Sequence, residues 1–104
     1  MKNDKVLSMV GLAMRAGKVL SGEFSVEKGI RSHQAYLVIV SNQASENTKK
    51  NFSDMCSYYK VPIFYYGSKE ELGMAIGKPF RASIALTDSG FANAVMKQIN
   101  MSKL

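Results

Sequence analysis

The chain has 104 residues, 46% of them hydrophobic, so we expect one domain with a packed core over residues 1–104 rather than a disordered chain. The single cysteine excludes an internal disulfide, and no apolar run reaches the roughly 18 residues that a membrane helix needs. We therefore expect a cytoplasmic protein, and its net charge of +6 favours a polyanionic partner, with nucleic acid ahead of an acidic membrane surface.

Helix and strand patterns alternate along the chain. Ser45 is placed to cap the third helix, and Ser68 with Glu71 predicts a capping box at the start of the fourth. The unbroken apolar run at residues 36–40 is typical of a strand covered on both faces. The predicted elements, in chain order, are a helix at 6–14, a strand at 18–21, a helix at 22–32, a strand at 36–40, a helix from Ser45 to before Val61, a strand at 63–66, a helix from Ser68 to before Gly77, a loop at 77–81, a strand at 82–86 and a helix capped by Asp88.

Strands that alternate with helices predict the α/β class, as a three-layer α/β/α sandwich around a small, partly parallel sheet. The order of the strands does not follow from these signals. The predicted core comes from the apolar stripes of the helices, which are Val6, Val10, Ala13 and Met14; Val26 and Ile30; Phe52, Met55, Cys56 and Tyr59; Leu72 and Ile76; and Ala92, Val95, Met96 and Ile99.

The most informative stretch is residues 17–28, in which a short strand passes through a glycine turn into a helix. An exposed helix N-terminus offers unpaired backbone N–H groups and partial positive charge, so it suits an anion such as a phosphate. Lys18 and Lys28 bracket this turn with full charges. The stretch is therefore the first candidate for a binding site.

Residues that could carry catalysis are sparse. His33 has no carboxylate or cysteine near it in the sequence and is expected to be exposed at a helix end, while Cys56 lies within an apolar stripe and reads as a buried thiol. Glu70 and Glu71 are adjacent carboxylates, but the capping box accounts for them. We find no metal-ligand spacing and no dinucleotide fingerprint, so we expect no enzyme, no metal and no cofactor.

Aromatic and basic residues offer the alternative of binding. The Met and Tyr residues are expected to fill the core, whereas Phe24 and Phe80 lie in or beside loops, where each either stacks on an unpaired base or packs under its loop. Lys49 and Lys50 are expected on a solvated face of the third helix. The remaining basic residues form one group around the second helix and one in the late loop, and they combine only if folding brings the two together; the groups are Arg15, Lys18, Lys28 and Arg31, and Lys78 and Arg81.

Motifs along nearly the whole chain resemble a known family, the kink-turn-binding ribosomal proteins of the archaeal L7Ae type, and within it the bacterial YlxQ-like branch. The number of ordered matches makes the resemblance specific. Its carriers are the segments Gly11-Leu12-Ala13-Met14-Arg15-Ala16-Gly17-Lys18, Ser21-Gly22-Glu23, Lys28, Ala44-Ser45-Glu46-Asn47-Thr48-Lys49-Lys50, Tyr59-Lys60-Val61-Pro62, Leu72-Gly73, Ile76-Gly77-Lys78 and Thr87-Asp88-Ser89-Gly90-Phe91-Ala92.

The resemblance implies a four-stranded mixed sheet and a surface for a kink-turn, a sharply bent RNA duplex with a three-nucleotide bulge beside tandem sheared G·A pairs. By the same resemblance, Gly22 allows close backbone approach, Lys28 reaches a guanine edge or a phosphate, and residues 77–80 cradle the bulged nucleotides with Arg81 behind them. The expected RNA-binding residues are Lys18, Ser21, Gly22, Glu23, Phe24, Ser25, Lys28, Arg31, Gly77, Lys78, Pro79, Phe80 and Arg81.

The chain departs from the archaeal pattern at Phe24 and Ser25, where archaeal members carry Asn-Glu that hydrogen-bonds the sheared guanines. A weaker kink-turn affinity or a different RNA preference follows. The leading hypothesis is a monomeric, non-catalytic protein that binds ribosomal or other structured RNA, with no DNA or membrane partner and a place in translation. The alternative is a protein-interaction module of ribosome assembly or translation with reduced RNA specificity.

Overall fold

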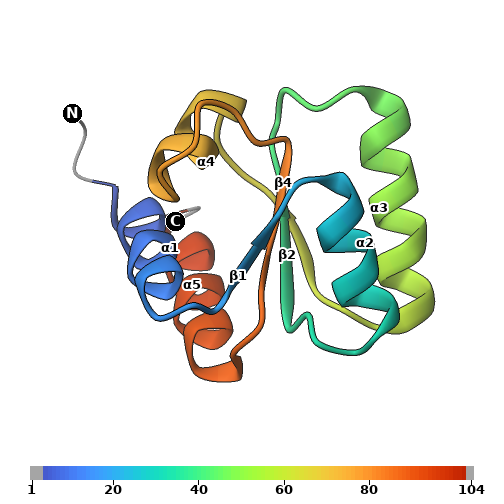
Figure 1. Cartoon of the computed structure of the whole chain (residues 1–104), viewed down its shortest axis with the longest axis horizontal. Helices are drawn as coiled ribbons and strands as arrows, with labels where there is room; N and C mark the ends of the chain where they lie inside the picture. The colour runs from blue at the N-terminus through green and yellow to red at the C-terminus, as the bar shows by residue number, and fades with distance from the viewer. Residues whose placement is uncertain (1–3, 103–104) are drawn as a thin grey trace.

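The computed structural model describes residues 4–102, in which five helices and four strands alternate as the sequence predicts (Figure 1). Each element lies within a few residues of its predicted range. Their bounds are α1 (Lys5–Arg15), β1 (Val19–Ser21), α2 (Glu23–Arg31), β2 (Leu37–Val40), α3 (Glu46–Tyr59), β3 (Ile63–Tyr65), α4 (Lys69–Ala75), β4 (Ser83–Leu86) and α5 (Ser89–Ser102).

Side-chain caps fix the starts of the helices where the sequence places them. The Ser45 hydroxyl accepts the Thr48 backbone N–H at 3.1 Å, and Ser68 and Glu71 form the reciprocal capping box of α4. At α5 the Asp88 carboxylate accepts the Phe91 backbone N–H at 2.9 Å. Each cap satisfies N–H groups that have no partner inside the helix, which makes these boundaries local and predictable.

The strands form one mixed sheet in the order β1-β4-β2-β3. Strand β2 pairs in parallel with β3, whereas β4 lies between β1 and β2 and runs antiparallel to both. The mixed four-stranded sheet is confirmed, and the structure adds the strand order. Because β4 runs against β1, the connection that enters β4 lies at the same end of the sheet as the turn that leaves β1.

Helices cover both faces of the sheet, which makes the predicted three-layer sandwich (Figure 1). Alternate residues of β2 serve the two layers: Leu37 and Ile39 pack with α1, α4 and α5, and Val38 and Val40 pack with α2 and α3. All four of these side chains are fully buried. The unbroken apolar run of this strand therefore has the cause that the sequence suggests, which is coverage on both sides.

Several residues that were expected to fill the core are exposed. Tyr36 precedes β2 and is half exposed, and Tyr58 is exposed on the polar side of α3. Tyr65, Met74 and Met101 are exposed as well, so the expectation of core filling is wrong for these five residues. Phe24 lies in the first turn of α2, beside the turn from β1, which agrees with its predicted position beside a loop. Among residues 4–102, none of the helices combines the length and the apolar character that crossing a membrane requires.

Candidate nucleic-acid interface

The turn from β1 into α2 exposes a helix N-terminus. Gly22 is the N-cap residue, with φ of +91° and no capping side chain, and its own N–H donates to the Ser83 carbonyl oxygen at 3.2 Å. A side chain at this left-handed φ would be strained, so glycine suits the turn. The backbone N–H groups of Glu23, Phe24 and Ser25 open the helix and have no intrahelical acceptor. They form a site that favours an anion.

The loop at residues 77–81 is held by the end of α4. Gly77 has φ of +75°, and the Lys78 N–H donates back to the Gly73 carbonyl oxygen at 2.8 Å, which closes a Schellman turn. The loop crosses directly over Gly73, because a Cβ there would lie 2.7 Å from the Lys78 oxygen and 2.8 Å from the Phe80 nitrogen. Its backbone path therefore depends on a glycine one turn earlier.

Arg81 joins the two segments. Its Nε donates to the Ser21 Oγ at 3.2 Å, its Nη1 donates to the Phe80 carbonyl oxygen at 2.6 Å, and its backbone N–H donates to the Lys69 carbonyl oxygen at 3.0 Å. The guanidinium thus links the end of β1 to the late loop across the β1–β4 pair, where Ser21 faces Ile84. The sequence left open whether the two basic groups meet, and the structure brings Arg81 of the second group to Ser21, at the turn that leads into the helix of Lys28.

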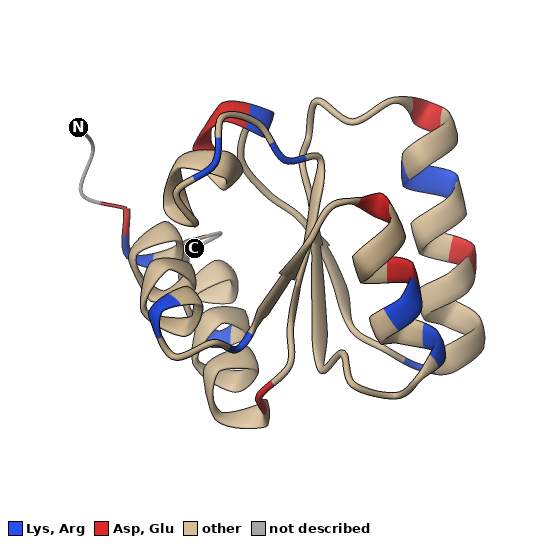
Figure 2. Cartoon of the chain, in the orientation of Figure 1, with Lys and Arg blue, Asp and Glu red and all other residues tan. Residues whose placement is uncertain are grey.

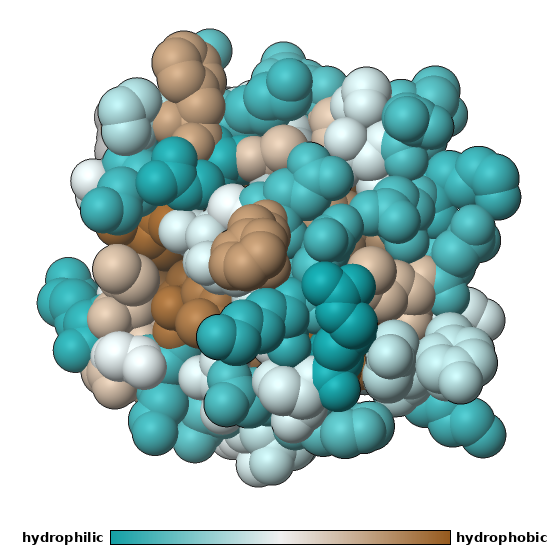
Figure 3. Space-filling model, turned by 45° about the vertical axis from the view of Figure 1, so that its right-hand side comes forward, coloured by the Kyte–Doolittle hydropathy of each residue, from teal (hydrophilic) through white to brown (hydrophobic). Residues whose placement is uncertain are grey.

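We call residues 21–25 and 77–81, with Lys28, the loop surface. Its two lysines, Lys28 and Lys78, are exposed, and Figure 2 shows basic residues on α2 and in the connection from α4 to β4. Phe24 is 76% exposed and Phe80 is 58% exposed, so neither packs under its loop. The face that Figure 3 turns forward is mostly hydrophilic, with a few separate apolar areas and one larger apolar area in a hollow toward the left. Two open rings beside two cations suit unpaired bases and phosphates.

Two predicted residues lie away from this surface. Lys18 sits at the start of β1, the opposite end of that strand from Ser21, where its carbonyl oxygen accepts the Thr87 N–H. Arg31 ends α2, and its guanidinium lies 3.8 Å from the Glu27 carboxylate. The solvated face expected for α3 is present, because Lys49 and Lys50 pair there with carboxylates of the same helix at 3.5 and 3.0 Å.

The groups considered for chemistry lie apart from one another. Cys56 is buried, as expected, and burial raises the pKa of its thiol to about 11, so it is protonated at neutral pH. His33 is exposed just after α2, with its ring edge-to-face with Tyr59 at 5.8 Å between centroids. Within residues 4–102, His, Cys, Asp and Glu form no group of three that could hold a metal ion.

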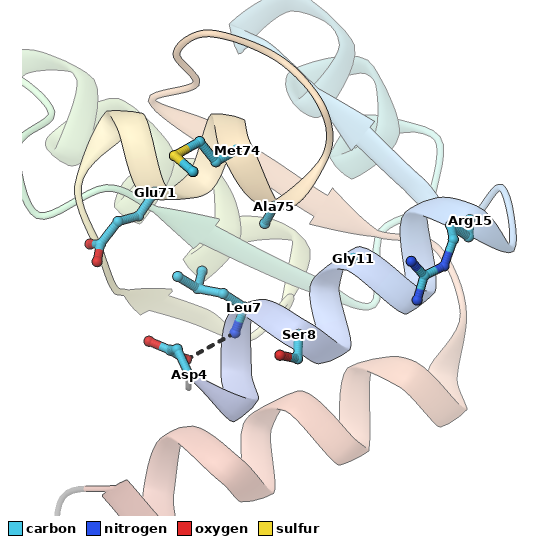
Figure 4. A pocket seen from close by; sticks show the side chains of 8 residues that line it. All are labelled: Asp4, Leu7, Ser8, Gly11, Arg15, Glu71, Met74 and Ala75. Atoms are coloured by element: carbon cyan, nitrogen blue, oxygen red, sulfur yellow. Dashed lines mark hydrogen bonds between the residues drawn. The ribbon is translucent and has the colours of Figure 1, made fainter. Parts of the chain in front are cut away.

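A groove of about 390 Å³ runs between α1 and α4, on the face away from α2 (Figure 4). Arg15 of α1 and Met74 of α4 are among its lining residues. At its end the Tyr66 hydroxyl donates to the Asp4 carboxylate at 2.8 Å. Burial, the hydrogen bond to Asp4 and the negative charges of Asp4 and Glu71 raise the pKa of Tyr66 to about 12. These contacts tie the start of α1 to the segment after β3.

An aromatic cluster that the sequence did not predict lies at the end of the sheet opposite the loop surface. Tyr36, Tyr58 and Tyr59 gather there around His33. The exposure of Tyr58 could have been predicted, because position 58 is not on the apolar stripe that positions 52, 55, 56 and 59 form on this helix. Tyr36 carried no such signal, since it extends the apolar run of β2 by one residue.

The chain is similar to one family of known proteins over most of its length. The model of the ribosomal protein L7Ae/L30e/S12e/Gadd45 family matches residues 4–96. The chain is 47% identical over 92 residues to RNA-binding protein YlxQ of Bacillus subtilis (strain 168), covering 88% of this chain and 92% of that protein. It is 45% identical over 96 residues to RNA-binding protein YlxQ of Enterococcus faecium, covering 92% of each chain.

A solved structure extends this agreement to three dimensions. A protein of unknown function from Bacillus halodurans C superimposes with a TM-score of 0.92 at 40% identity, over 94% of this chain and 99% of that one. The fold, the length and the sequence of these relatives therefore agree with one another.

Proposed function

Because the chain belongs to the ribosomal protein L7Ae/L30e/S12e/Gadd45 family, we propose that it is a non-catalytic RNA-binding protein that recognises a kink-turn through its loop surface. Relatives of nearly equal length at 45–47% identity are named RNA-binding proteins, which supports RNA as the partner. The finer statement, that the RNA is a kink-turn in ribosomal or another structured RNA, is what the family resemblance implies, and the geometry of the two loops is compatible with it.

The observation that carries the proposal is the Arg81 link between the late loop and the end of β1. Through this link the N-terminus of α2 lies beside the 77–81 loop. The loop surface therefore offers backbone N–H groups, two lysines and two exposed aromatic rings. A sharply bent duplex presents phosphates and splayed bases close together. Structured RNA is recognised in this way, by shape, by phosphate contacts and by stacking on unpaired bases.

Phe24 and Ser25 bear on specificity within this function. Both lie in the first turn of α2, where side chains can reach a bound duplex, yet the phenyl ring offers no hydrogen bond and the hydroxyl is short. Losing a bidentate contact to a base costs about 1–3 kcal/mol, taking the magnitude from DNA readout. We therefore propose that this protein discriminates more by RNA shape and stacking than by hydrogen bonds to the sheared guanines.

A gel-shift titration tests the proposal with two RNAs of equal length and composition, one a kink-turn and one with its G·A pairs replaced by Watson–Crick pairs. We expect the kink-turn to bind at least about tenfold more tightly, a difference of about 1.4 kcal/mol. Equal affinities would leave only non-specific attraction to a basic protein and would contradict kink-turn recognition.

The exposed Phe24 and Phe80 also favour a second candidate, a module that docks on a protein through the same surface. The salt dependence of binding separates the two. RNA affinity falls steeply as salt is added, because counterions released into a more concentrated solution gain less entropy, whereas a contact made through apolar rings is nearly insensitive to salt. A partner retained from low to high salt would favour the protein-interaction module.

A further inference from the structure

We propose that the end of the sheet opposite the loop surface is a second RNA contact, which binds single-stranded RNA by stacking bases on exposed aromatic rings. We call this the aromatic surface and define it as Lys18, His33, Tyr36, Tyr58, Tyr59 and Lys60. The inference goes beyond the proposed function, because neither the family relationship nor the loop surface assigns any role to this end of the molecule.

Connections that are far apart in the sequence meet at this end. The link from α1 to β1, the link from α2 to β2 and the start of the link from β4 to α5 together line an open hollow of about 490 Å³. Gly17, Leu20, His33, Tyr36 and Thr87 are among its lining residues. In Figure 1 these connections lie in the lower part of the view, whereas the connection from α4 to β4 lies along the upper edge and the turn from β1 into α2 lies below it, near the centre.

His33 connects the hollow to a series of rings on α3. Its ring meets Tyr59 edge-to-face at 5.8 Å between centroids, and Tyr59 meets Tyr58 edge-to-face at 4.9 Å. Tyr58 is 79% exposed and Tyr36 is 50% exposed. Each therefore leaves ring area open to solvent, and every base has a π-face that can stack there whatever its sequence.

Exposed cations accompany the rings. Lys18 follows Gly17, which lines the hollow, and Lys60 follows Tyr59; both lysines are exposed. Within the described part of the chain neither lysine forms a salt bridge, so both ammonium groups are open to a phosphate. Arg31 at the end of α2 adds a third cation, shared with Glu27. The nearby Asp88 carboxylate is engaged by the Phe91 N–H as a helix cap.

The combination argues for single-stranded RNA as the occupant. Rings interleaved with cations are the two components that bind a single strand without sequence preference, one for the bases and one for the backbone. Protein interfaces are also enriched in tyrosine but are depleted in lysine, so the lysines beside these rings favour a phosphate backbone as the occupant. Here the apolar side chains at this end, such as Leu20, are partly covered, and the exposed groups are tyrosines, a histidine and lysines.

Two backbone positions make the inference testable without harm to the fold. His33 and Lys60 both have φ of +61°, a left-handed conformation that glycine adopts more readily. Replacing Lys60 by glycine therefore suits the backbone while it removes the ammonium group. If this variant is stable and binds single-stranded RNA more weakly, the loss of binding is due to the missing side chain and not to a change in the fold.

The main experiment measures the affinity of the whole protein for a kink-turn RNA, for the same RNA with a single-stranded extension of about ten uridines, and for the uridine strand alone. In the unmodified protein we expect the extension to raise affinity at least about fivefold. The double variant Tyr36→Ala/Tyr58→Ala loses this gain and keeps its affinity for the unextended RNA. Lys60→Gly reduces the gain while its Tm is unchanged or higher.

Tyr65→Ala is the matched control, because Tyr65 is also an exposed tyrosine but lies at the C-terminal end of β3, away from the aromatic surface. It should keep the full gain. An extension without effect on the unmodified protein, or an equal loss in Tyr65→Ala, would overturn the inference and leave kink-turn recognition standing. If the unextended kink-turn does not bind, the proposed function fails. The uridine strand alone then decides the inference, which stands only if Tyr36→Ala/Tyr58→Ala abolishes its binding.

Discussion

The two ends of the sheet differ in the residues that hold their left-handed backbone positions. At the loop surface the left-handed positions are glycines, Gly22 and Gly77, and the path of the loop depends on a third, Gly73. At the end that carries the aromatic surface, His33 and Lys60 hold two left-handed positions, and only the third is a glycine, Gly17. The first end is thus shaped by its backbone and the second by its side chains. Substitutions should therefore act through geometry at one end and through lost contacts at the other.

The largest effect is expected from Gly73→Ala. The new Cβ would press on backbone atoms of residues 78–80 at 2.7–2.9 Å, so the loop must move. Overpacking of this kind costs about 1–3 kcal/mol of unfolding free energy, and we expect kink-turn affinity to fall at least about tenfold. Chemical denaturation and a gel shift measure the two effects.

Gly90→Ala is the control at the opposite end, in the first turn of α5. Its Cβ would lie 3.1 Å from the Asp88 Oδ2, the oxygen that caps α5, so any adjustment stays at the start of that helix. Kink-turn affinity should be unchanged. A loss of affinity equal to that of Gly73→Ala would show that the loop surface is not specially sensitive to its backbone.

Lys28→Ala tests the part of the loop surface that acts through charge. Lys28 is exposed on α2, one turn after Phe24, so we expect kink-turn affinity to fall about five- to tenfold and the salt slope to drop by nearly one unit. Lys50→Ala on α3 removes an equal charge from an exposed pair with Asp54 and serves as the reference. Equal losses from both variants would mean that only net charge matters.

Tyr66→Phe probes the α1–α4 groove, which belongs to neither end. It removes a hydrogen bond to the Asp4 carboxylate, so we expect a loss of about 1 kcal/mol of unfolding free energy and unchanged RNA affinity. The raised pKa of Tyr66 makes the contribution pH-dependent. It is complete below about pH 10, the ordinary pKa of tyrosine, and is lost as the pH rises through about 12.

Denaturation curves from pH 8 to 12 measure this difference for the protein and for Tyr66→Phe. The gap between the two should close toward the upper limit. A gap that stays constant would contradict the role given to the Tyr66 hydroxyl, and a change in RNA affinity would show that the groove is coupled to the loop surface.

The smallest expected effect is a gain in stability from Lys60→Gly. Relief of the left-handed backbone should raise the unfolding free energy by about 0.5–1 kcal/mol, which thermal denaturation detects. Gly77→Ala, the reverse exchange at the loop surface, should be destabilising. If Lys60→Gly is destabilising as well, the lysine contributes packing, and the contrast between the two ends is weaker than we infer.

Local signals in the sequence predict the elements well. The caps at Ser45, Ser68 and Asp88 act within three or four residues, so they need no knowledge of the rest of the fold. The contact between Arg81 and Ser21 spans 60 residues and depends on the strand order, which no local pattern encodes. The site could therefore be predicted as two candidate segments, and only the family resemblance joined them.

The position of Lys18 shows that residues close in the sequence can lie far apart in the fold. It lies only four residues before Gly22 in the sequence, yet β1 carries it to the opposite end of the sheet. Proximity along the chain grouped it with Lys28 on the basis of charge. An extended strand separates its two ends by about 3.3 Å per residue, so even a short one moves a side chain out of reach.

The central position of β4 has a consequence for synthesis. It is the last strand to leave the ribosome, yet β1 and β2 both pair with it and do not pair with each other. A nascent chain that ends before residue 86 therefore lacks the strand that holds both ends of the sheet together. Truncated products should have neither the loop surface nor the aromatic surface in order, so the RNA binding that we propose for them would be a property of finished molecules.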